Sequence, residues 1–435
     1  MDRANRTVAF ALLALCMLAV ICNVRLVRAS GPIYIRADGT VEPIGAPIQR
    51  NGDVYILTDN VTSQTDGIVI EKSSIAFDGS GYTVQGGAGG NGFYLNGISN
   101  VTIRNARTEG FNYGIYLEST SRNVISRNDI RGSTYDGIGL YDATNNTVSS
   151  NSIKENDWSG IGLYFSLDNN ISANHISNNY YGMNCFSSQE NWIFHNNFVA
   201  NTNQTSSDGL PNTWDNGYPS GGNYWNDYIG TDIYSGPNQN QPGSDGIGDT
   251  PYNVSENNQD GYPLMQKWTN IAITAISSSK TAVGQGQKAN ITIIVQNQGW
   301  DAVTTIVTLY ANTTILSSFT NIALTGRTQT MLTYTWQTAS FDKAKYVISA
   351  NATAIPGETN TADNTYIYGL VLVTIMGDVD GNCNVNVLDA IDLSNSFSKS
   401  IGQAGFNPDA DFDDNGVVNI LDAITLANNY NQHYP

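Results

Sequence analysis

Apolar and polar positions repeat along the stretch from Gly92 to Asn196. Each copy opens on a glycine and continues with nearly the same phrase: GFYL, GIYL, GIGL, GIGL and GMNC. Two apolar residues in each phrase are separated by one position, which is the period of a β-strand and not of a helix. One copy cannot bury its apolar face alone, so the pattern predicts a solenoid of stacked short strands.

Stacking the copies aligns their apolar residues in columns. The columns hold Phe93, Ile115, Ile138, Ile161 and Met183; Leu95, Leu117, Leu140, Leu163 and Cys185; Thr102, Ile125, Val148, Ile171 and Ile193; and Ile130, Ile153, Ile176 and Phe198. Two files of asparagine hold Asn100, Asn123, Asn146, Asn169 and Asn191, and Asn105, Asn128, Asn151, Asn174 and Asn196. Asparagine tolerates the backbone angles of sharp bends. The pattern therefore predicts a right-handed parallel β-helix with amide ladders at its corners.

The first 29 residues are typical of an export signal. Arg3 and Arg6 precede an apolar run from Val8 to Cys22, and residues 27–29 offer a cleavage site. The run is short for a membrane span, although an uncleaved N-terminal anchor is the alternative. We expect the mature chain to lie outside the cell.

Composition narrows the possible partners. The formal net charge is -18, so we expect neither nucleic acid, which requires a basic surface, nor a nucleotide as partner. Only 13% of the residues are charged, whereas the chain has 42 glycines and 24 tyrosines. This is the composition of a polar, turn-rich β protein.

The period ends after Asn196, and residues 205–265 are rich in aromatic and acidic residues. We expect the large rings here to cover the last coil: Trp214, Tyr224, Trp225 and Tyr228. The alternative is a loop that binds a ligand or calcium through Asp245 and Asp249.

The segment 30–265 resembles exported archaeal β-helix proteins of the NosD type, from the superfamily of carbohydrate-binding and sugar-hydrolysing proteins. The resemblance lies in the opening IYIRADG, the coil repeats, and the closing phrases NTWDNGYPSGGNYW and SDGIGDTPY. Founding members are linked to copper delivery. The copper donors available here are His175, His195, Met183 and Cys185. The two histidines fall in different columns and the two sulfur residues in core columns, so copper is weakly indicated.

Residues 266–374 alternate apolar and polar positions in short strands, as in ANITIIVQNQGWDAVTTIVTLYANTTIL. A segment of this length and pattern predicts an immunoglobulin-like β-sandwich. The phrases VQNQG and ETNTADN and the central Trp336 resemble the CARDB domain, which implies a spacer or adhesion module.

Two acidic phrases near the C-terminus, GDVDGNCNVNVLDAI and DFDDNGVVNILDAI, are duplicates. Each has oxygen-bearing residues at the spacing of an EF-hand loop, which surrounds calcium. The predicted ligands are Asp378, Asp380, Asn382, Asn384, Asn386 and Asp389 in the first loop, and Asp411, Asp413, Asn415, Val417, Asn419 and Asp422 in the second. The duplication resembles a type I dockerin, which implies two calcium ions and a cohesin-like partner. Cys383 replaces the turn glycine that Gly416 supplies, so we expect the first site to be the weaker one.

Aromatic residues flank the glycines of the repeat and are candidates for glycan binding. They are Tyr135, Trp158 and Tyr180 before the glycine, and Tyr141, Tyr164 and Phe186 after it. Stacked rings form flat platforms suited to sugar rings, or else they only stabilise the solenoid surface. Candidate acids are Asp136, Asp142 and Asp157, and candidate bases are Lys154 and Arg131. The acids do not recur in columns, so catalytic residues stay unassigned.

These features predict a mainly β protein: a right-handed parallel β-helix, then an immunoglobulin-like β-sandwich, then a small α-helical calcium-loop (dockerin) module. The expected segments are a signal peptide (1–29), the β-helix with its caps (30–265), the CARDB-like sandwich (266–374) and the dockerin-like module (375–435). The expected function is a secreted or surface protein that binds polysaccharide or glycoprotein and docks to a cohesin-like protein. The alternatives are a glycoside hydrolase or polysaccharide lyase, and a purely structural surface-layer protein.

Overall fold

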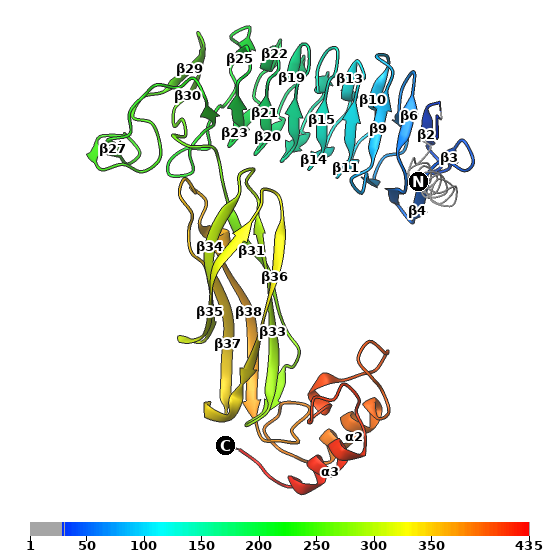
Figure 1. Ribbon diagram of the computed structural model, residues 1–435, viewed down its shortest axis with the longest axis vertical. Coiled ribbons are helices and arrows are strands. Elements are labelled where there is room, and N and C mark those ends of the chain that lie inside the picture. Colours follow the sequence, from blue (N-terminus) through cyan, green and yellow to red (C-terminus); the bar gives the residue numbers. More distant parts are fainter. Residues whose placement is uncertain (1–27, 30, 435) are drawn as a thin grey trace, which may run out of the picture. The chain divides into compact units, whose positions relative to one another are not determined.

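The computed structural model describes residues 28–29 and 31–434 (Figure 1). The chain forms two compact units, residues 1–265 and residues 266–435. The predicted export signal lies outside the described residues, apart from the pair that forms β1 (Arg28–Ala29). No helix of the described part is long and apolar enough to cross a membrane.

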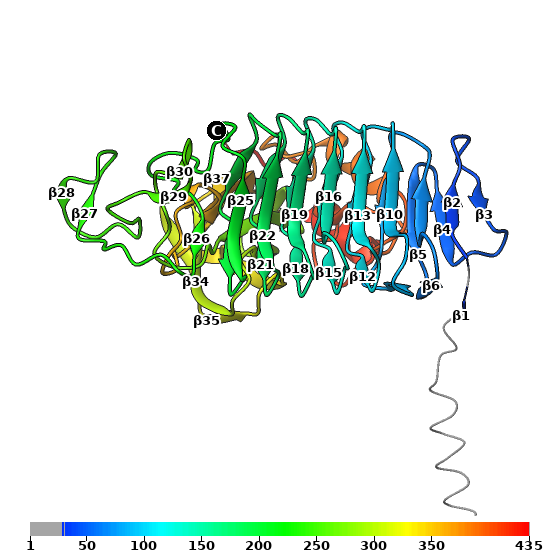
Figure 2. The ribbon, with the colours of Figure 1, turned by 90° about the horizontal axis from the view of Figure 1, so that it is seen from above.

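Unit 1 is a parallel β-helix built on three sheets, whose strands lie in parallel rows (Figures 1 and 2). Sheet A contains β1, β6 (Val61–Ser63), β9 (Thr83–Gly86), β12 (Arg107–Glu109), β15 (Asp129–Arg131), β18 (Ser152–Lys154), β21 (His175–Ser177), β24 (Asn197–Val199) and β26 (Tyr224–Trp225). Sheet B contains β25 (Asn203–Ser207), β22 (Tyr181–Phe186), β19 (Ser159–Tyr164), β16 (Ile138–Tyr141), β13 (Tyr113–Glu118), β10 (Asn91–Asn96), β7 (Ile68–Ile70), β2 (Ile33–Ile35) and β3 (Val41–Glu42). Sheet C contains β23 (Trp192–Phe194), β20 (Asn170–Ser172), β17 (Thr147–Ser149), β14 (Val124–Ser126), β11 (Thr102–Arg104), β8 (Ala76–Asp78), β5 (Val54–Leu57) and β4 (Ile48–Asn51).

The predicted apolar columns of sheet B are confirmed. Leu140 pairs with Leu117 on one side and Leu163 on the other, and all three are fully buried. Stacking places every apolar side chain against the same position of the next coil, so the core is continuous from one end to the other.

The predicted register of the first coil is wrong by one residue in sheet C and at the corners. Ile103, not Thr102, pairs with Ile125. The two asparagine files also begin one coil later, because the backbone N–H groups of Val101 and Ala106 donate to Asn123 and Asn128. Asn100 and Asn105 instead adopt positive φ angles at the turns. The repeat predicts no member of the fourth column in the first coil, but Thr108 occupies that place beside Ile130.

The amide ladders hold the corners together. Asn151 Nδ2 donates to Asn174 Oδ1 over 3.0 Å, and the Asn151 backbone N–H donates to the same oxygen over 2.9 Å. A third ladder, which the sequence pattern had not indicated, runs through Asn156, Asn179 and Asn201. Each amide is buried and bonded, so the ladders satisfy the polar groups that a sharp corner would otherwise leave unpaired.

Aromatic residues close the far end of the solenoid core. Trp225 stacks between Phe198 and Tyr252, with ring centroids 4.4 and 4.2 Å away. Trp214 is fully buried beside it, which confirms the predicted role of these two tryptophans as a cap. The buried carboxylate of Asp260 accepts from Trp225 Nε1 over 2.8 Å. The cap also contains β27 (Tyr234–Ser235), β28 (Gln241–Pro242), β29 (Tyr252–Ser255) and β30 (Asn258–Asp260).

Unit 2 begins with two sheets around one apolar core, in which Trp336 is fully buried. The smaller sheet contains β31 (Ile271–Ser278), β33 (Lys288–Asn297) and β36 (Gln329–Gln337). The larger sheet contains β32 (Ala282–Gly284), β38 (Thr365–Thr374), β37 (Ala344–Ala352), β34 (Val303–Ala311) and β35 (Thr314–Leu324). Short 3₁₀ turns are η1 (Thr338–Ser340), η2 (Ala362–Asn364) and η3 (Pro408–Ala410).

The C-terminal part of unit 2 has its own small core and two α-helices, α2 (Val387–Ser396) and α3 (Ile420–Asn428). Each helix follows one of the two acidic loops. Asn386 and Asn419 are their N-caps, and each forms a capping box with an aspartate in the first helical turn. The immunoglobulin-like and dockerin-like classifications of unit 2 stay predictions.

Candidate functional site

The outer surface of sheet B carries a set of rings that we call the aromatic face. Its members are Tyr94, Tyr113, Tyr116, Tyr135, Tyr141, Trp158, Tyr164, Phe165, Tyr180, Tyr181 and Phe186. Outward residues alternate with the buried columns along each strand, so equivalent rings recur on successive coils. Tyr135, Trp158 and Tyr180 are 50, 43 and 43% exposed, which leaves their surface available to a ligand.

The predicted files of rings are stacked only in part. Trp158 and Tyr180 are stacked, with centroids 5.5 Å apart and planes at 21°. Tyr141 and Phe186 instead contact Phe165 edge to face, at 68° and 88°. The second file is therefore not the flat platform that the repeat predicts, because Phe165 lies between its members.

Sequence reasoning missed a second stack on the same face. Tyr94 and Tyr116 are stacked at 5.8 Å and 11°, and Tyr113 lies 4.6 Å from Tyr116. Tyr113 also contacts Tyr135, at 5.4 Å. Tyr94 and Tyr116 both stand two positions after the repeat glycine, and that common position is the signal that could have found them.

Two later copies have glycine at this same outward position, and neighbouring side chains fill the space. A Cβ atom on Gly139 would lie 3.0 Å from Tyr113 Cδ1. A Cβ atom on Gly162 would lie 2.3 Å from Asp136 Oδ2 and 2.7 Å from Tyr164 Cε2. The ring of Tyr164 therefore lies across Gly162, against the carboxylate of Asp136.

The candidate catalytic groups do not gather in one place. Arg131 and Lys154 lie on sheet A, where Arg131 pairs with Glu109 over 2.8 Å and Lys154 with Asp129 over 3.7 Å. Asp136 is buried on the outer face of sheet B, whereas Asp142 is exposed beyond the end of β16. The geometry therefore assigns no catalytic pair.

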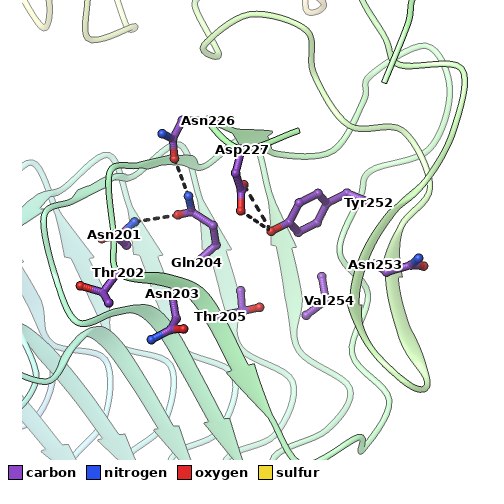
Figure 3. Close-up of a pocket in the computed structure, with 10 residues that line it drawn as sticks. All are labelled: Asn201, Thr202, Asn203, Gln204, Thr205, Asn226, Asp227, Tyr252, Asn253 and Val254. Carbon is purple, nitrogen blue, oxygen red and sulfur yellow. Dashed lines mark hydrogen bonds between the residues drawn. The ribbon is translucent and has the colours of Figure 1, made fainter. Parts of the chain in front are cut away.

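A polar pocket of about 420 Å³ lies at the last coil (Figure 3). It is lined by Asn201, Thr202, Asn203, Gln204, Thr205, Asn226, Asp227, Tyr252, Asn253 and Val254. Asn201 Nδ2 donates to Gln204 Oε1 over 3.0 Å, and Tyr252 donates to the carboxylate of Asp227 over 3.3 Å. The first of these bonds ends the third amide ladder, and Thr205 continues the column of Met183. These contacts explain why the pocket is lined by polar residues: it is the end of the solenoid.

The alternative prediction for the cap is a loop that binds a ligand or calcium. In the structure, the two aspartates of this loop accept hydrogen bonds from backbone N–H groups. Asp249 accepts from the N–H groups of Ile233 and Tyr234, each over 3.0 Å. Asp245 accepts from Ile247 N over 3.1 Å. Both aspartates therefore fix the shape of the loop.

The possible copper donors do not form an accessible cluster. Met183 and Cys185 are buried in the core columns, where burial raises the pKa of the Cys185 thiol to about 12. His195 is buried, with Nε2 2.8 Å from the Ser220 carbonyl oxygen, and burial lowers its pKa to about 4. His175 lies on β21 of sheet A.

The two acidic loops each bring three carboxylates together. Oxygens of Asp378, Asp380 and Asp389 lie within 4.8 Å of one another, and so do oxygens of Asp411, Asp413 and Asp422. The first and last acid of each triad are buried, and burial raises the pKa of Asp378 and of Asp411. Buried carboxylates at this separation repel one another without a cation, so either triad can hold a metal ion.

The loops share their internal hydrogen bonds. Cys383 N donates to Asp378 Oδ2 over 2.9 Å, as Gly416 N does to Asp411 Oδ2. The φ angles at these two turn positions are +67° and +84°. A side chain is disfavoured in this left-handed conformation, so Cys383 strains the first loop where Gly416 relaxes the second.

The two-sheet part of unit 2 holds the second loop in place, which the sequence did not indicate. The buried Lys280 donates from Nζ to the Asp411 carbonyl oxygen over 2.8 Å and pairs with Asp414 over 2.7 Å. The backbone N–H of Thr281 donates to Asp409 over 2.9 Å. The loop segment is therefore attached to β31–β32 and their connection by buried polar contacts.

Comparison with known proteins gives one family match. Residues 33–230 match the family described as periplasmic copper-binding protein (NosD). That description fits an exported protein. No curated protein matches the chain.

Several solved structures are similar to parts of the chain. The CARDB domain of a Pyrococcus furiosus protein, solved with di-metal ions, is 24% identical over 25% of this chain and 92% of its own, with a TM-score of 0.22. The periplasmic alginate epimerase AlgG is 14% identical over 40% of this chain and 64% of its own, with a TM-score of 0.26. The A-module of the Azotobacter vinelandii mannuronan C-5 epimerase AlgE6 is 15% identical over 35% and 46%, with a TM-score of 0.27. At these values the similarities carry no argument about function.

Proposed function

We propose that this chain is an exported or cell-surface protein that binds a polysaccharide or the glycan of a glycoprotein on its aromatic face. The observation that carries the proposal is the exposed stack of Trp158 and Tyr180. Flat rings with one free face are suited to the apolar faces of sugar rings. Exposed aromatics that cluster on one face indicate an interaction site more strongly than scattered ones do.

The test replaces one ring and measures both binding and folding. Trp158→Ala should weaken glycan binding about twofold to tenfold, since an aromatic contact is worth roughly 0.5–1.5 kcal/mol. Its melting temperature should stay nearly unchanged, because the ring is outside the core. Trp192→Ala is the matched control: this tryptophan is 54% exposed but belongs to sheet C. Binding that survives Trp158→Ala while the melting temperature falls favours the purely structural role instead.

The enzymatic alternative has its own readout. Release of reducing ends or of unsaturated products from a bound polysaccharide identifies a hydrolase or a lyase, whose two chemistries need acid and base groups near the scissile bond. Binding without release supports the binding function.

A second function, calcium-dependent docking, is favoured by the exposed surfaces of α2 and α3. Both helices expose equivalent apolar residues: Val387, Leu388 and Ile391 on α2, and Ile420, Leu421 and Ile424 on α3. We infer that these are docking positions for a cohesin-like partner, as the resemblance to type I dockerins implies. The oxygen-only donors of the loops favour calcium over copper or zinc.

Charge on the docking surface tests this function. Ile391→Asp with Ile424→Asp should reduce binding to a cohesin-like module exported by the same cell by at least tenfold. Both side chains are about half exposed, at 49 and 50%, so the fold should survive. Ile229→Asp is a control on a 96% exposed residue outside unit 2. Equal binding by the double variant and the control would remove the docking assignment.

A further inference from the structure

The carboxyl group of Asp136 is buried on the aromatic face without well-formed hydrogen bonds. Its side chain has no exposed surface, and neither carboxylate oxygen has a hydrogen-bond partner of normal geometry among the described residues. The hydroxyls of Ser159 and Tyr164 and the backbone N–H of Ser159 face it, and all three favour the carboxylate form. A buried carboxyl group whose hydrogen bonds are poorly formed costs free energy, which makes this one a candidate for ligand recognition.

The surroundings of Asp136 show how a ligand can reach it. Beside it lies Gly162, which offers no side chain, and the cover is the half-buried ring of Tyr164. The hydroxyl of Tyr164 accepts a single long bond, 3.3 Å from Asn184 Nδ2. Rotation of the Tyr164 side chain would remove a ring that lies against the carboxylate, on the face that also carries the stack of Trp158 and Tyr180.

We propose that Asp136 is the group of the aromatic face that recognises ligand hydroxyls, and that the ligand is a neutral polysaccharide with vicinal hydroxyl groups. Two neighbouring O–H donors match the two acceptor oxygens of one carboxylate, and they replace the poorly placed hydroxyls of Ser159 and Tyr164. This inference rests on the proposed glycan-binding function and adds the class of glycan.

The charges on this surface select against acidic glycans. The strands β10, β13, β16, β19 and β22 have the sequences NGFYLN, YGIYLE, IGLY, SGIGLY and YGMNCF, which contain no lysine or arginine. The acids on or beside these strands are Asp136 itself, Glu118 on β13, Asp142 after β16 and Asp157 before β19. A polyuronate would place its own carboxylates beside these groups without a compensating cation, which costs free energy in a partly buried site.

Binding should also depend on pH. Burial raises the pKa of Asp136 to about 6. The titratable groups that face it are Tyr164 on β19 and Tyr113 on β13, whose pKa values are also raised, so both stay neutral near pH 6. Hydroxyl donors stabilise the carboxylate over the acid, so bound ligand lowers this pKa. The affinity should therefore rise as the pH increases from 5 to 7 and level off above.

The experiment measures binding of full-length protein to laminarin and mannan, as neutral probes, and to polygalacturonate, as an acidic probe, at pH 5, 6, 7 and 8. We expect binding to a neutral probe that strengthens toward pH 7. Asp136→Asn should weaken it about tenfold or more at pH 7 and remove the pH dependence. Asp142→Asn, which removes an exposed acid nearby, is the matched control and should leave both unchanged.

The outcomes separate this inference from the function on which it rests. Preference for polygalacturonate, or a flat pH profile of the wild-type protein, overturns the role of Asp136 even if Trp158→Ala still weakens binding. No binding to any polysaccharide or glycoprotein overturns both. If Asp136→Asn lowers the melting temperature strongly, the wild-type pH profile and Tyr164→Phe decide: loss of the hydroxyl cover should leave binding intact or strengthen it, and weaker binding would contradict the inference.

Discussion

Chelation of calcium should loosen the C-terminal loops of the full-length protein while unit 1 stays folded. Within each triad the acids are held within 4.8 Å of one another, and the first and last of them are buried, so a cation should supply much of the local stability. A ligand that binds only the native form stabilises it by about 2.7 kcal/mol when its concentration is 100 times Kd. Hydrogen exchange of residues 378–428 with and without chelator measures the effect.

Three substitutions make this expectation sharper. Cys383→Gly should strengthen metal binding at the first loop, because glycine relieves the positive φ angle of +67°. Asp422→Ala should weaken the response more than Asp389→Ala, since the second loop has its glycine and is attached to the two-sheet part of unit 2 by Lys280. Identical exchange with calcium and with chelator would contradict the assignment of the loops as calcium sites. Magnesium should substitute poorly, since it prefers a small octahedral shell.

Leu140→Ala should destabilise unit 1 by about 2–5 kcal/mol, through lost burial and a cavity in the middle of the stack. The side chain is fully buried between Leu117 and Leu163, and the coils on both sides restrain the backbone from closing the gap. Chemical denaturation of the full-length protein measures the change. Leu210→Ala is the control of the same chemistry at a 37% exposed position. A loss below about 1 kcal/mol would show that the column tolerates a cavity.

The solenoid could be predicted from the repeat because each copy contains the residues that define its own strands and corners. Each short strand carries its own alternation and each corner its own asparagine or glycine, so the columns of Leu140 and Ile138 follow from counting. The count failed at Thr102, Asn100 and Asn105, because the first coil has Val101 and Ala106 where the later coils have asparagine, and its own two asparagines stand one residue earlier. The spacing from the glycine to the sheet C column is the same in the first coil as in the later ones, so the mismatch lay in the residue types and not in the period.

The acidic loops could also be predicted from the sequence, because the oxygen-bearing residues of each loop lie within one short segment. The clustering of three carboxylates in each loop and the positive φ angle at Cys383 agree with the spacing of the residues. The contacts of Lys280 and Thr281 with the second loop could not be predicted, because these residues are far from the loop in sequence and belong to no motif.

The sequence by itself therefore determined the stacked β-strands, the buried columns and the acidic triads, all of which depend on residues close together in the chain or on an exact repeat. Only the tertiary structure determined how the outward-facing aromatic rings pack against one another. Phe165 separates Tyr141 from Phe186, and the missing side chain at Gly162 lets Tyr164 lie across Asp136. Such contacts depend on the side-chain rotations of several coils at once, and alternation along one strand cannot specify them.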